Sequence, residues 1–269
     1  MTRTLALAAD RTRIELLQYA REKEAVFFNF LFPVLMLGLF STIFADSFTN
    51  DPQDGGTSAG QFFLPGMIAA GVMLTSFQTM ALAVATERDD GTLKRLHATP
   101  LPRVSYFLGK IGLVLVTSLA QLALLLLLAA LLFDVELPTS PGRWVTFAWV
   151  FVLGIAGGTA LGIAYSSLAS SARSAGAIVI APALVLQFIS GVYFAFRDMP
   201  GWLQHVAALF PLKWVAQGMR SVFFPDSMAS MEMAGSWEHG RTALVLGVWA
   251  VAGLVLCVRT FGWTKKGST

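Results

Sequence analysis

A serine within a glycine-rich run is the first residue in this sequence whose setting suggests chemistry. The run Gly56-Thr57-Ser58-Ala59-Gly60 matches the Gly-x-Ser-x-Gly pattern of a nucleophile elbow. Such an elbow needs a strand before the serine and a helix after it within an α/β sheet, whereas this run follows the acidic stretch 51–54. The setting therefore predicts a loop, with no catalytic residue.

Metal and nucleotide chemistry are also unsupported by the sequence. His97, His205 and His239 lie far apart without metal-ligand spacing, and Cys257 is the single cysteine. The chain contains no Gly-x-x-x-x-Gly-Lys-[Ser/Thr] phosphate loop. We expect no metal and no cofactor bound by this chain. If ATP drives the protein, a partner chain hydrolyses it.

A charged island between two uncharged stretches is the most informative part of the chain. Residues 61–86 and 111–133 contain no charge, and each stretch exceeds the roughly 20 residues that a membrane helix needs. Each charged side chain placed at mid-membrane costs about 2.5 to 3.5 kcal/mol. The island therefore predicts a water-facing loop that contacts a soluble partner. Its charged residues are Glu87, Arg88, Asp89, Asp90, Lys94, Arg95, Arg103 and Lys110.

The composition indicates a polytopic membrane protein. Of the 269 residues, 55% are hydrophobic and 13% charged, and the mean hydropathy is +0.66, unlike an ordinary soluble domain. We expect an all-α membrane protein with six transmembrane helices, the last of them the shortest. The six predicted spans are 25–45, 61–86, 107–133, 144–168, 174–196 and 242–258.

The distribution of lysine and arginine predicts the orientation. Fourteen of the 19 fall at the termini, in the island and at Arg173, and cytoplasmic loops are enriched in these residues. Both termini and the island are therefore expected in the cytoplasm of a multi-pass cell-membrane protein, in a bacterial inner membrane or a plasma membrane. The net charge of +3 then reflects topology and does not indicate nucleic-acid binding.

The predicted domain organisation has three parts. Residues 1–24 form a cytoplasmic helix on the membrane surface, 25–261 form the six-span domain, and 262–269 form a cytoplasmic tail. The alternative for residues 1–24 is an ordinary solvated helix. The expected apolar face of this helix comprises Leu5, Ala8, Ala9, Thr12, Leu16, Tyr19 and Ala20, and another face carries Arg11, Glu15 and Glu22.

An unusually apolar external segment, 199–225, is expected to dip back into the membrane. Pro200 and Pro211 can each begin a short helix, and Trp202 and Trp214 suit the interface between headgroups and acyl chains. Lys213 and Arg220 suit the same interface. Contact with an anionic substrate or lipid is the alternative for these two cations.

Glycines and amides mark the interiors of the spans. Gly154, Gly158 and Gly162 repeat every four residues, which predicts a helix-packing surface within the chain or between subunits. The embedded polar residues are amides, such as Gln187, and no ionisable group lies away from the ends of the predicted spans. This pattern argues against a proton or ion relay.

The island and the external segment together resemble the permease subunits of type 2 ATP-binding-cassette exporters. The island is similar to the family segment Glu-x-x-x-Gly-Thr-x-x-x-Leu-x-x-x-Pro. The matching residues in the island are Glu87, Gly91-Thr92, Leu96, Pro100 and Gly109-Lys110. Those of the external segment are Ser190-Gly191, Pro200, Trp202-Leu203, Pro211-Leu212 and Gly218-Met219-Arg220.

The resemblance implies a coupling loop over residues 87–110. Two cytoplasmic ATP-binding-cassette subunits carrying ATP and Mg would dock there, and a second permease half, identical or related, would complete the membrane dimer. Leu93 and Leu96 would share the face that packs on the ATPase. The expected coupling residues are Glu87, Arg88, Gly91, Thr92, Leu93, Arg95, Leu96 and Pro100.

The expected substrate is hydrophobic or amphipathic, such as a drug, a lipid or a glycolipid. A path lined by aromatic, Met and amide side chains without charge suits such a compound better than an ion. The candidate lining residues are Phe30, Met36, Phe77, Met80 and Gln187.

Two alternatives remain from other functional classes. One is a standalone ion-coupled carrier. The other is a membrane enzyme acting on lipid, although its candidate groups lack a recognisable catalytic spacing. Those groups are His205, His239, Asp226, Glu232 and Glu238.

Overall fold

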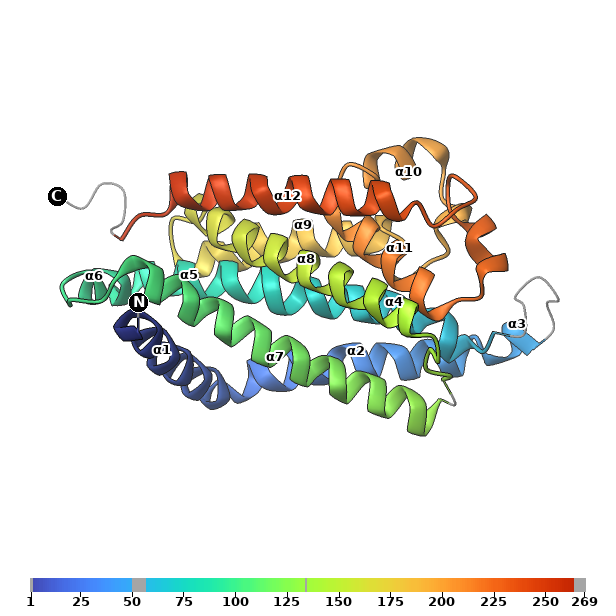
Figure 1. The fold of residues 1–269 in the computed structure, drawn as a ribbon, viewed down its shortest axis with the longest axis horizontal. Helices are drawn as coiled ribbons and strands as arrows, with labels where there is room; N and C mark the ends of the chain where they lie inside the picture. Colours follow the sequence, from blue (N-terminus) through green and yellow to red (C-terminus); the bar gives the residue numbers. More distant parts are fainter. Residues whose placement is uncertain (1, 50–56, 134, 264–269) are drawn as a thin grey trace.

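The computed structural model describes residues 2–49, 57–133 and 135–263, which form a bundle of helices without strands (Figure 1). Within these residues, six helical segments are long and apolar enough to cross a membrane, as predicted. They are α2 (Lys23–Ile43), α4–η2–α5 (Ala59–Asp89), α7 (Arg103–Leu132), α8–η3 (Pro141–Leu168), α9 (Ala172–Ile189) and α12 (His239–Thr260).

Short helices connect these segments. In chain order they are α3 (Ala45–Thr49), α6 (Thr92–His97), η4 (Phe196–Asp198), α10 (Gly201–Ala207), α11 (Pro211–Phe223) and η5 (Asp226–Met231), and the 20-residue α1 (Thr2–Arg21) precedes the first span. The start of α1, the end of α12 and α6 lie at one end of the bundle, called here the α6 end (Figure 1). Helices α3 and α10 lie at the other end, called the α3 end (Figure 1).

The fifth span is shorter than the sequence predicted, and the sixth is longer. Helix α9 has 18 residues, whereas α12 has 22, so the prediction that the last span is the shortest was wrong. Helix α9 ends at Ile189, because Gly191 adopts a left-handed conformation with φ of +72° that terminates a helix. The residues after Gly191 then continue as η4 and α10.

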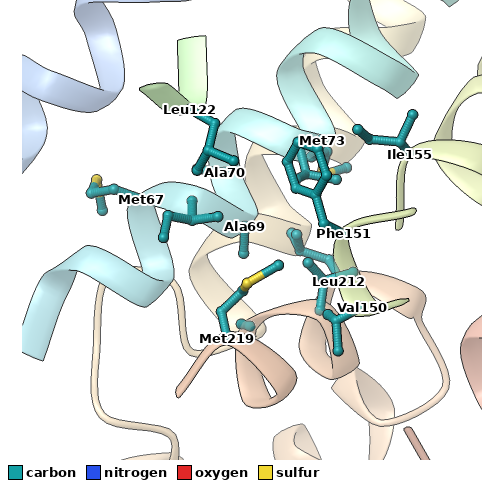
Figure 2. Close-up of a cluster of buried hydrophobic side chains, with 14 of the residues drawn as sticks. Met67, Ala69, Ala70, Met73, Leu122, Val150, Phe151, Ile155, Leu212 and Met219 are labelled. Carbon is teal, nitrogen blue, oxygen red and sulfur yellow. The ribbon is translucent and has the colours of Figure 1, made fainter. Parts of the chain in front are cut away.

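The second span is the central helix of the bundle. Its most apolar window is 72% buried, compared with 22% for α2, α9 and α12. It consists of α4 (Ala59–Val72), the π-helix η2 (Met73–Gln78) and α5 (Thr79–Asp89). Figure 2 shows Met67 and Met73 from this helix packed with Phe151 of α8 and Met219 of α11. Helices α7, α8 and α11 therefore surround a shared apolar core.

The glycine stripe of α8 (Pro141–Tyr165) lies against this central helix. A Cβ atom on Gly158 would overlap the hydroxyl of Ser76, and one on Gly162 would lie 2.5 Å from the backbone oxygen of Phe77. The structure thus places these two glycines at contacts within the chain. Gly154 lies beside Val72 and Val215, at 3.2 and 3.1 Å from its Cβ position.

We predict that Gly162→Ala destabilises the protein whereas Gly157→Ala does not. The added methyl group at position 162 meets backbone that cannot rotate away, and overpacking of this kind costs about 1 to 3 kcal/mol. Gly157 offers a matched control on the same helix, since its Cβ would lie at an ordinary 3.6 Å from Ala250. Thermal unfolding in mild detergent, followed by tryptophan fluorescence, measures the difference. Equal unfolding temperatures for the two variants would contradict the close approach at Gly162.

Candidate functional site

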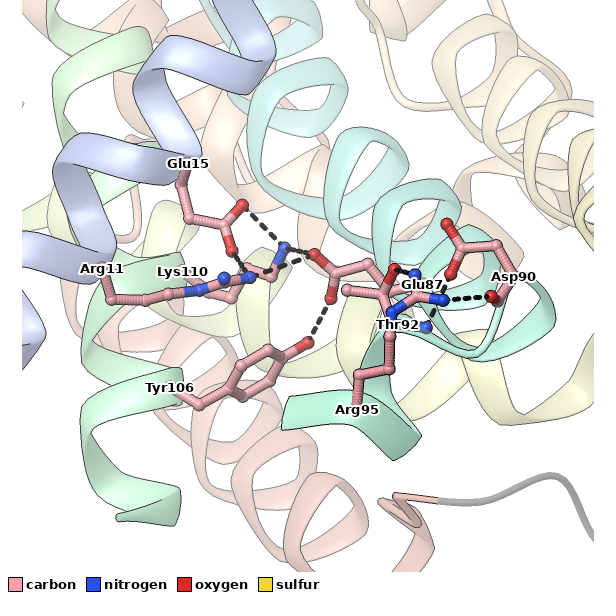
Figure 3. A network of polar contacts seen from close by, with 8 residues as sticks. All are labelled: Arg11, Glu15, Glu87, Asp90, Thr92, Arg95, Tyr106 and Lys110. Atoms are coloured by element: carbon pink, nitrogen blue, oxygen red, sulfur yellow. Dashed lines mark hydrogen bonds and ion pairs between the residues drawn. The ribbon is translucent and has the colours of Figure 1, made fainter. Parts of the chain in front are cut away.

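A buried cluster of charges joins α1, α5 and α7 at the α6 end (Figure 3). The Lys110 ammonium lies 2.8 Å from Glu15 Oε2 and 2.6 Å from Glu87 Oε1. Arg11 pairs with Glu15 and lies 3.4 Å from Glu87 Oε1, while the Tyr106 hydroxyl donates a hydrogen bond of 2.8 Å to Glu87 Oε2. We call these five residues the ion cluster. Two cations and two carboxylates make its formal charge zero.

Two glycines of α7 allow α1 to approach closely enough to form the cluster. A Cβ on Gly109 would overlap the side chain of Arg11, and one on Gly112 would overlap that of Thr12. On α1, Arg11 and Glu15 are four residues apart and therefore lie on one helical face. Lys110 follows Gly109 directly, so the same turn of α7 supplies both the close contact and the cation.

The ion cluster corrects two expectations drawn from the sequence. Glu87 and Lys110 were assigned to a water-facing loop, yet only 13% and 1% of their side chains are exposed. Arg11 and Glu15, expected on a separate face of α1 from its apolar residues, are buried as well. Burial is tolerated because each charge has an oppositely charged partner within hydrogen-bond distance.

Helix α6 remains available at the surface, although not through the face that the sequence suggested. Gly91 turns the chain with a left-handed φ of +78°, and the Thr92 amide donates to Asp90 Oδ1 at 2.8 Å. Leu93 is fully buried in the bundle, which contradicts its expected contact with a partner. Lys94, Arg95 and Pro100 are exposed, while Leu96 is partly buried.

A second set of contacts ties the start of the island to the turn between α8 and α9. The guanidinium of Arg88 donates to the backbone oxygen of Ser166 at 2.8 Å and to its hydroxyl at 3.1 Å. The amide of Ala172 donates to Asp89 Oδ2 at 3.0 Å. We call these contacts the clasp. No sequence pattern indicates the clasp, because it joins residues about 80 positions apart.

Aromatic residues after α12 cover α6 and α7 at the same end. Trp263 stacks on the imidazole of His97 with ring centroids 5.4 Å apart, and it lies 5.4 Å from the ring of Tyr106. Phe261 packs against Tyr106 at 5.6 Å. Of the predicted tail 262–269, only residues 262 and 263 lie within the described part of the chain.

The profile of the ABC-2 type transporter family matches residues 11–224, a region that contains the whole ion cluster, α6 and α11. The chain belongs to the ABC-2 type transporter family. The prediction of a transport permease without an ATPase motif is thereby confirmed at the level of the family.

Curated relatives carry permease names. The chain is 26% identical over 182 residues to YbhR of Escherichia coli K12, named as a probable multidrug ABC transporter permease, covering 65% of this chain and 47% of that protein. It is 28% identical over 211 residues to ycf38 of Porphyra purpurea, named as a transport permease, with coverage of 77% and 70%. The chain thus spans about half the length of the Escherichia coli relative, at 47%.

The predicted substrate-path residues of this ABC-2 chain do not gather at one place. Phe77, in η2, lines an apolar cavity between η2, α8, α9, α11 and α12. Met80 is fully buried in the core, and Gln187 accepts a hydrogen bond from the Tyr193 hydroxyl. Phe30 and Met36 are partly buried on α2. Their role as a path remains a prediction.

The external segment forms α10 and α11, and its cations are buried. Trp202 on α10 is 69% exposed, whereas Trp214 on α11 is buried. The Arg220 guanidinium lies 2.5 Å from Glu232 Oε1 and donates to the Gly191 backbone oxygen at 2.9 Å. The expectation that this arginine anchors at headgroups was therefore wrong, because an acidic residue 12 positions later neutralises it within the protein.

Lys213 is buried in the same helix. Its ammonium donates to Gln217 and lies 3.9 Å from the centroid of the Trp214 ring. Burial lowers the pKa of Lys213 from 10.5 to about 8.

The remaining candidates for lipid chemistry do not converge: His205 and Asp226 are exposed, and the described residues contain no group of three metal-ligating side chains. Pro200 precedes α10 and Pro211 begins α11, as the sequence predicted.

We predict that Lys110→Met strongly destabilises the protein. The substitution leaves Glu15 and Glu87 buried with Arg11 as their remaining cation, and breaking a buried ion pair costs about 3 to 5 kcal/mol. Lys94→Met is the matched control on exposed α6, where a surface substitution changes stability by about 0.5 kcal/mol or less. Unfolding in a mixed-detergent titration measures both. An equally stable Lys110→Met variant would show that the cluster contributes nothing to the fold.

Proposed function

We propose that this chain is the membrane subunit of an ATP-driven exporter that moves a hydrophobic or amphipathic compound out of the cytoplasm or the inner leaflet. The compound class includes drugs, lipids and glycolipids. The observation that carries the proposal is the exposed α6, which directly follows the end of α5 that the ion cluster and the clasp hold, in a chain of the ABC-2 type transporter family. A helix held in this way can transmit a push from outside into several spans.

The proposed partners are two cytoplasmic ATP-binding-cassette subunits, which bind ATP and Mg, and a second permease half that is identical or related. The ATPases dock on α6, where Lys94 and Arg95 present positive charge to the solvent. This arrangement requires the α6 end, and both termini with it, to face the cytoplasm, in agreement with the lysine and arginine distribution. Membrane lipid surrounds the six spans.

Two connections carry motion inward from α6. The ion cluster holds α1 and α7 to the end of α5, because separating any of these helices would leave a buried charge without its partner. The clasp holds the same end of α5 to η3 through Arg88 and to the start of α9 through Asp89. Closure of the ATPases would therefore move α1, α5, α7 and α9 together and change the space between this group and the rest of the bundle.

An ion-coupled carrier is less well supported. The buried charges of the ion cluster are mutually neutralised at one end of the bundle, whereas ion-coupled carriers bind their ions near the midplane. The polar groups near the middle of the central helix are hydroxyls and an amide, among them Thr75, Thr79 and Gln78. Such groups suit an amphipathic substrate.

Docking on α6 is tested by reversing its exposed charge. We expect Lys94→Glu combined with Ala98→Glu to reduce recovery of an ATP-binding-cassette subunit several-fold when the tagged chain is purified from its native membrane in mild detergent. Both positions are exposed, so the fold should persist. Mass spectrometry of the co-purifying proteins provides the measurement.

The matched control for docking is Arg197→Glu, an exposed charge reversal outside α6, which should leave recovery unchanged. Unchanged recovery with the α6 variant would exclude this helix as the docking site. Absence of any ATPase with the wild-type chain, under conditions that preserve other membrane complexes, would overturn the exporter proposal.

The clasp is tested by Arg88→Gln, which removes the two hydrogen bonds to Ser166. We expect the ATPase to remain bound while export per ATP hydrolysed falls several-fold, because η3, at the end of the fourth span, no longer follows α5. Reconstituted vesicles loaded with ATP and a fluorescent amphiphile allow both rates to be measured. Arg173→Gln, at an exposed arginine in the first turn of α9, should leave the ratio unchanged. A normal ratio in Arg88→Gln would exclude the Arg88–Ser166 contact from transmission and leave the ion cluster and the Asp89–Ala172 contact.

A further inference from the structure

An apolar cavity of about 230 Å³ lies among η2, α8, α9, α11 and α12. It is larger than the engineered apolar cavity of about 150 Å³ that stays dry and binds benzene or xenon. Met73 and Leu212, both drawn in Figure 2, belong to its wall. Phe77, Leu161 and Leu186 complete much of the remaining surface. A cavity of this size and lining is therefore a site for an apolar guest.

The cavity has almost no free polar group to recognise a polar ligand. The Ser76 hydroxyl in its wall donates to the Val72 backbone oxygen at 2.5 Å, and the Trp249 indole donates to the Leu209 backbone oxygen at 2.9 Å. Drug-like ligands need a few well-placed polar groups to fix their orientation. The lining chemistry therefore favours a hydrocarbon over a drug with polar substituents.

The cavity is elongated along the bundle. Its α8 lining extends from Leu153 to Tyr165, which at 1.5 Å per residue covers about 18 Å of helix. Tyr165 is the last residue of α8, so this end of the cavity lies toward the α6 end. An extended chain fits such a shape better than a compact ring system.

The cavity reaches the outer surface of the bundle. Pro182 of α9 lines it and is exposed, and its neighbours Leu184 and Val185 are 48% and 58% exposed. On α12, Trp249 lines the cavity, while Val248 and Val251 are 58% and 64% exposed. In a membrane, these exposed apolar residues face lipid tails, so a tail can enter the cavity between α9 and α12 without crossing water.

We propose that this cavity binds a fatty acyl chain of a bilayer lipid. The chain fills a space that would otherwise forfeit dispersion contacts, and it lies against η2 at the centre of the bundle. The site is independent of the proposed exporter function, because it rests on the cavity, its lining and its access from the membrane.

A photoactivatable phosphatidylcholine with a diazirine at the end of one acyl chain tests the site. The full chain is placed in nanodiscs that contain this lipid, irradiated and digested, and the labelled residues are identified by mass spectrometry. We expect labelling of cavity residues such as Leu161, Leu186 and Leu246, in addition to the outward faces that any membrane lipid touches. Leu186→Trp fills the cavity and should reduce labelling of Leu161 and Leu246 several-fold.

Leu184→Trp is the matched control, since it makes the same substitution two residues away on the lipid-facing side of α9. It should leave cavity labelling unchanged. Leu161→Phe fills the cavity from α8 and keeps the test valid if Leu186→Trp does not fold. Size-exclusion elution and labelling of the outward-facing Val258 show whether each variant is folded. Labelling confined to outward faces in the wild type, or undiminished by either cavity-filling variant, would overturn the proposal. So would cavity labelling by a diazirine fatty acid without any by the phospholipid.

Discussion

The neutralisation of four buried charges is the constraint on which the α6 end of this protein depends. An isolated carboxylate or ammonium removed from water costs several kcal/mol, and this cost is offset only when an opposite charge is held at hydrogen-bond distance. The ammonium of Lys110 from α7 meets this condition by pairing with the carboxylates of Glu15 from α1 and Glu87 from α5. The three helices are therefore fixed relative to one another. Gly109 and Gly112 make the meeting possible by admitting α1 against α7.

This constraint also determines what an exposed α6 can do. A surface helix on a flexible linker would absorb a push by bending its own connections. Here the last turn of α5, just before α6, carries residues of both the ion cluster and the clasp. Buried Leu93 also anchors α6 itself in the core. A force on Lys94 or Arg95 therefore reaches α5 directly, and through it α1, α7 and α9. The rigidity of the site supports the proposed coupling role of α6.

Hydrophobicity predicted the six spans and their order because the length of an apolar run is a property of the sequence alone. The direction in which Glu87 and Lys110 point cannot be read from the local sequence, because it depends on partners about 20 to 95 positions away. A signal was nevertheless present: the i, i+4 pair Arg11 and Glu15, and the glycines beside Lys110. The burial of Arg220 was missed for the same reason, since its partner Glu232 was assigned to a separate group of residues.

The central helix shows how a membrane span can serve several neighbours at once. At η2 the backbone hydrogen bonds span five residues instead of four. The amide and the hydroxyl of Thr79 both donate to the backbone oxygen of Leu74, five residues earlier. The hydroxyl satisfies backbone polarity that lipid could not. One extra residue in the turn rotates everything that follows. Phe77 thereby faces the apolar cavity, while Thr79 accepts a hydrogen bond from Asn29 of α2 on another side. The π-helix thus lets Phe77 of η2 line the cavity beside α8 while Thr79, the first residue of α5, meets α2.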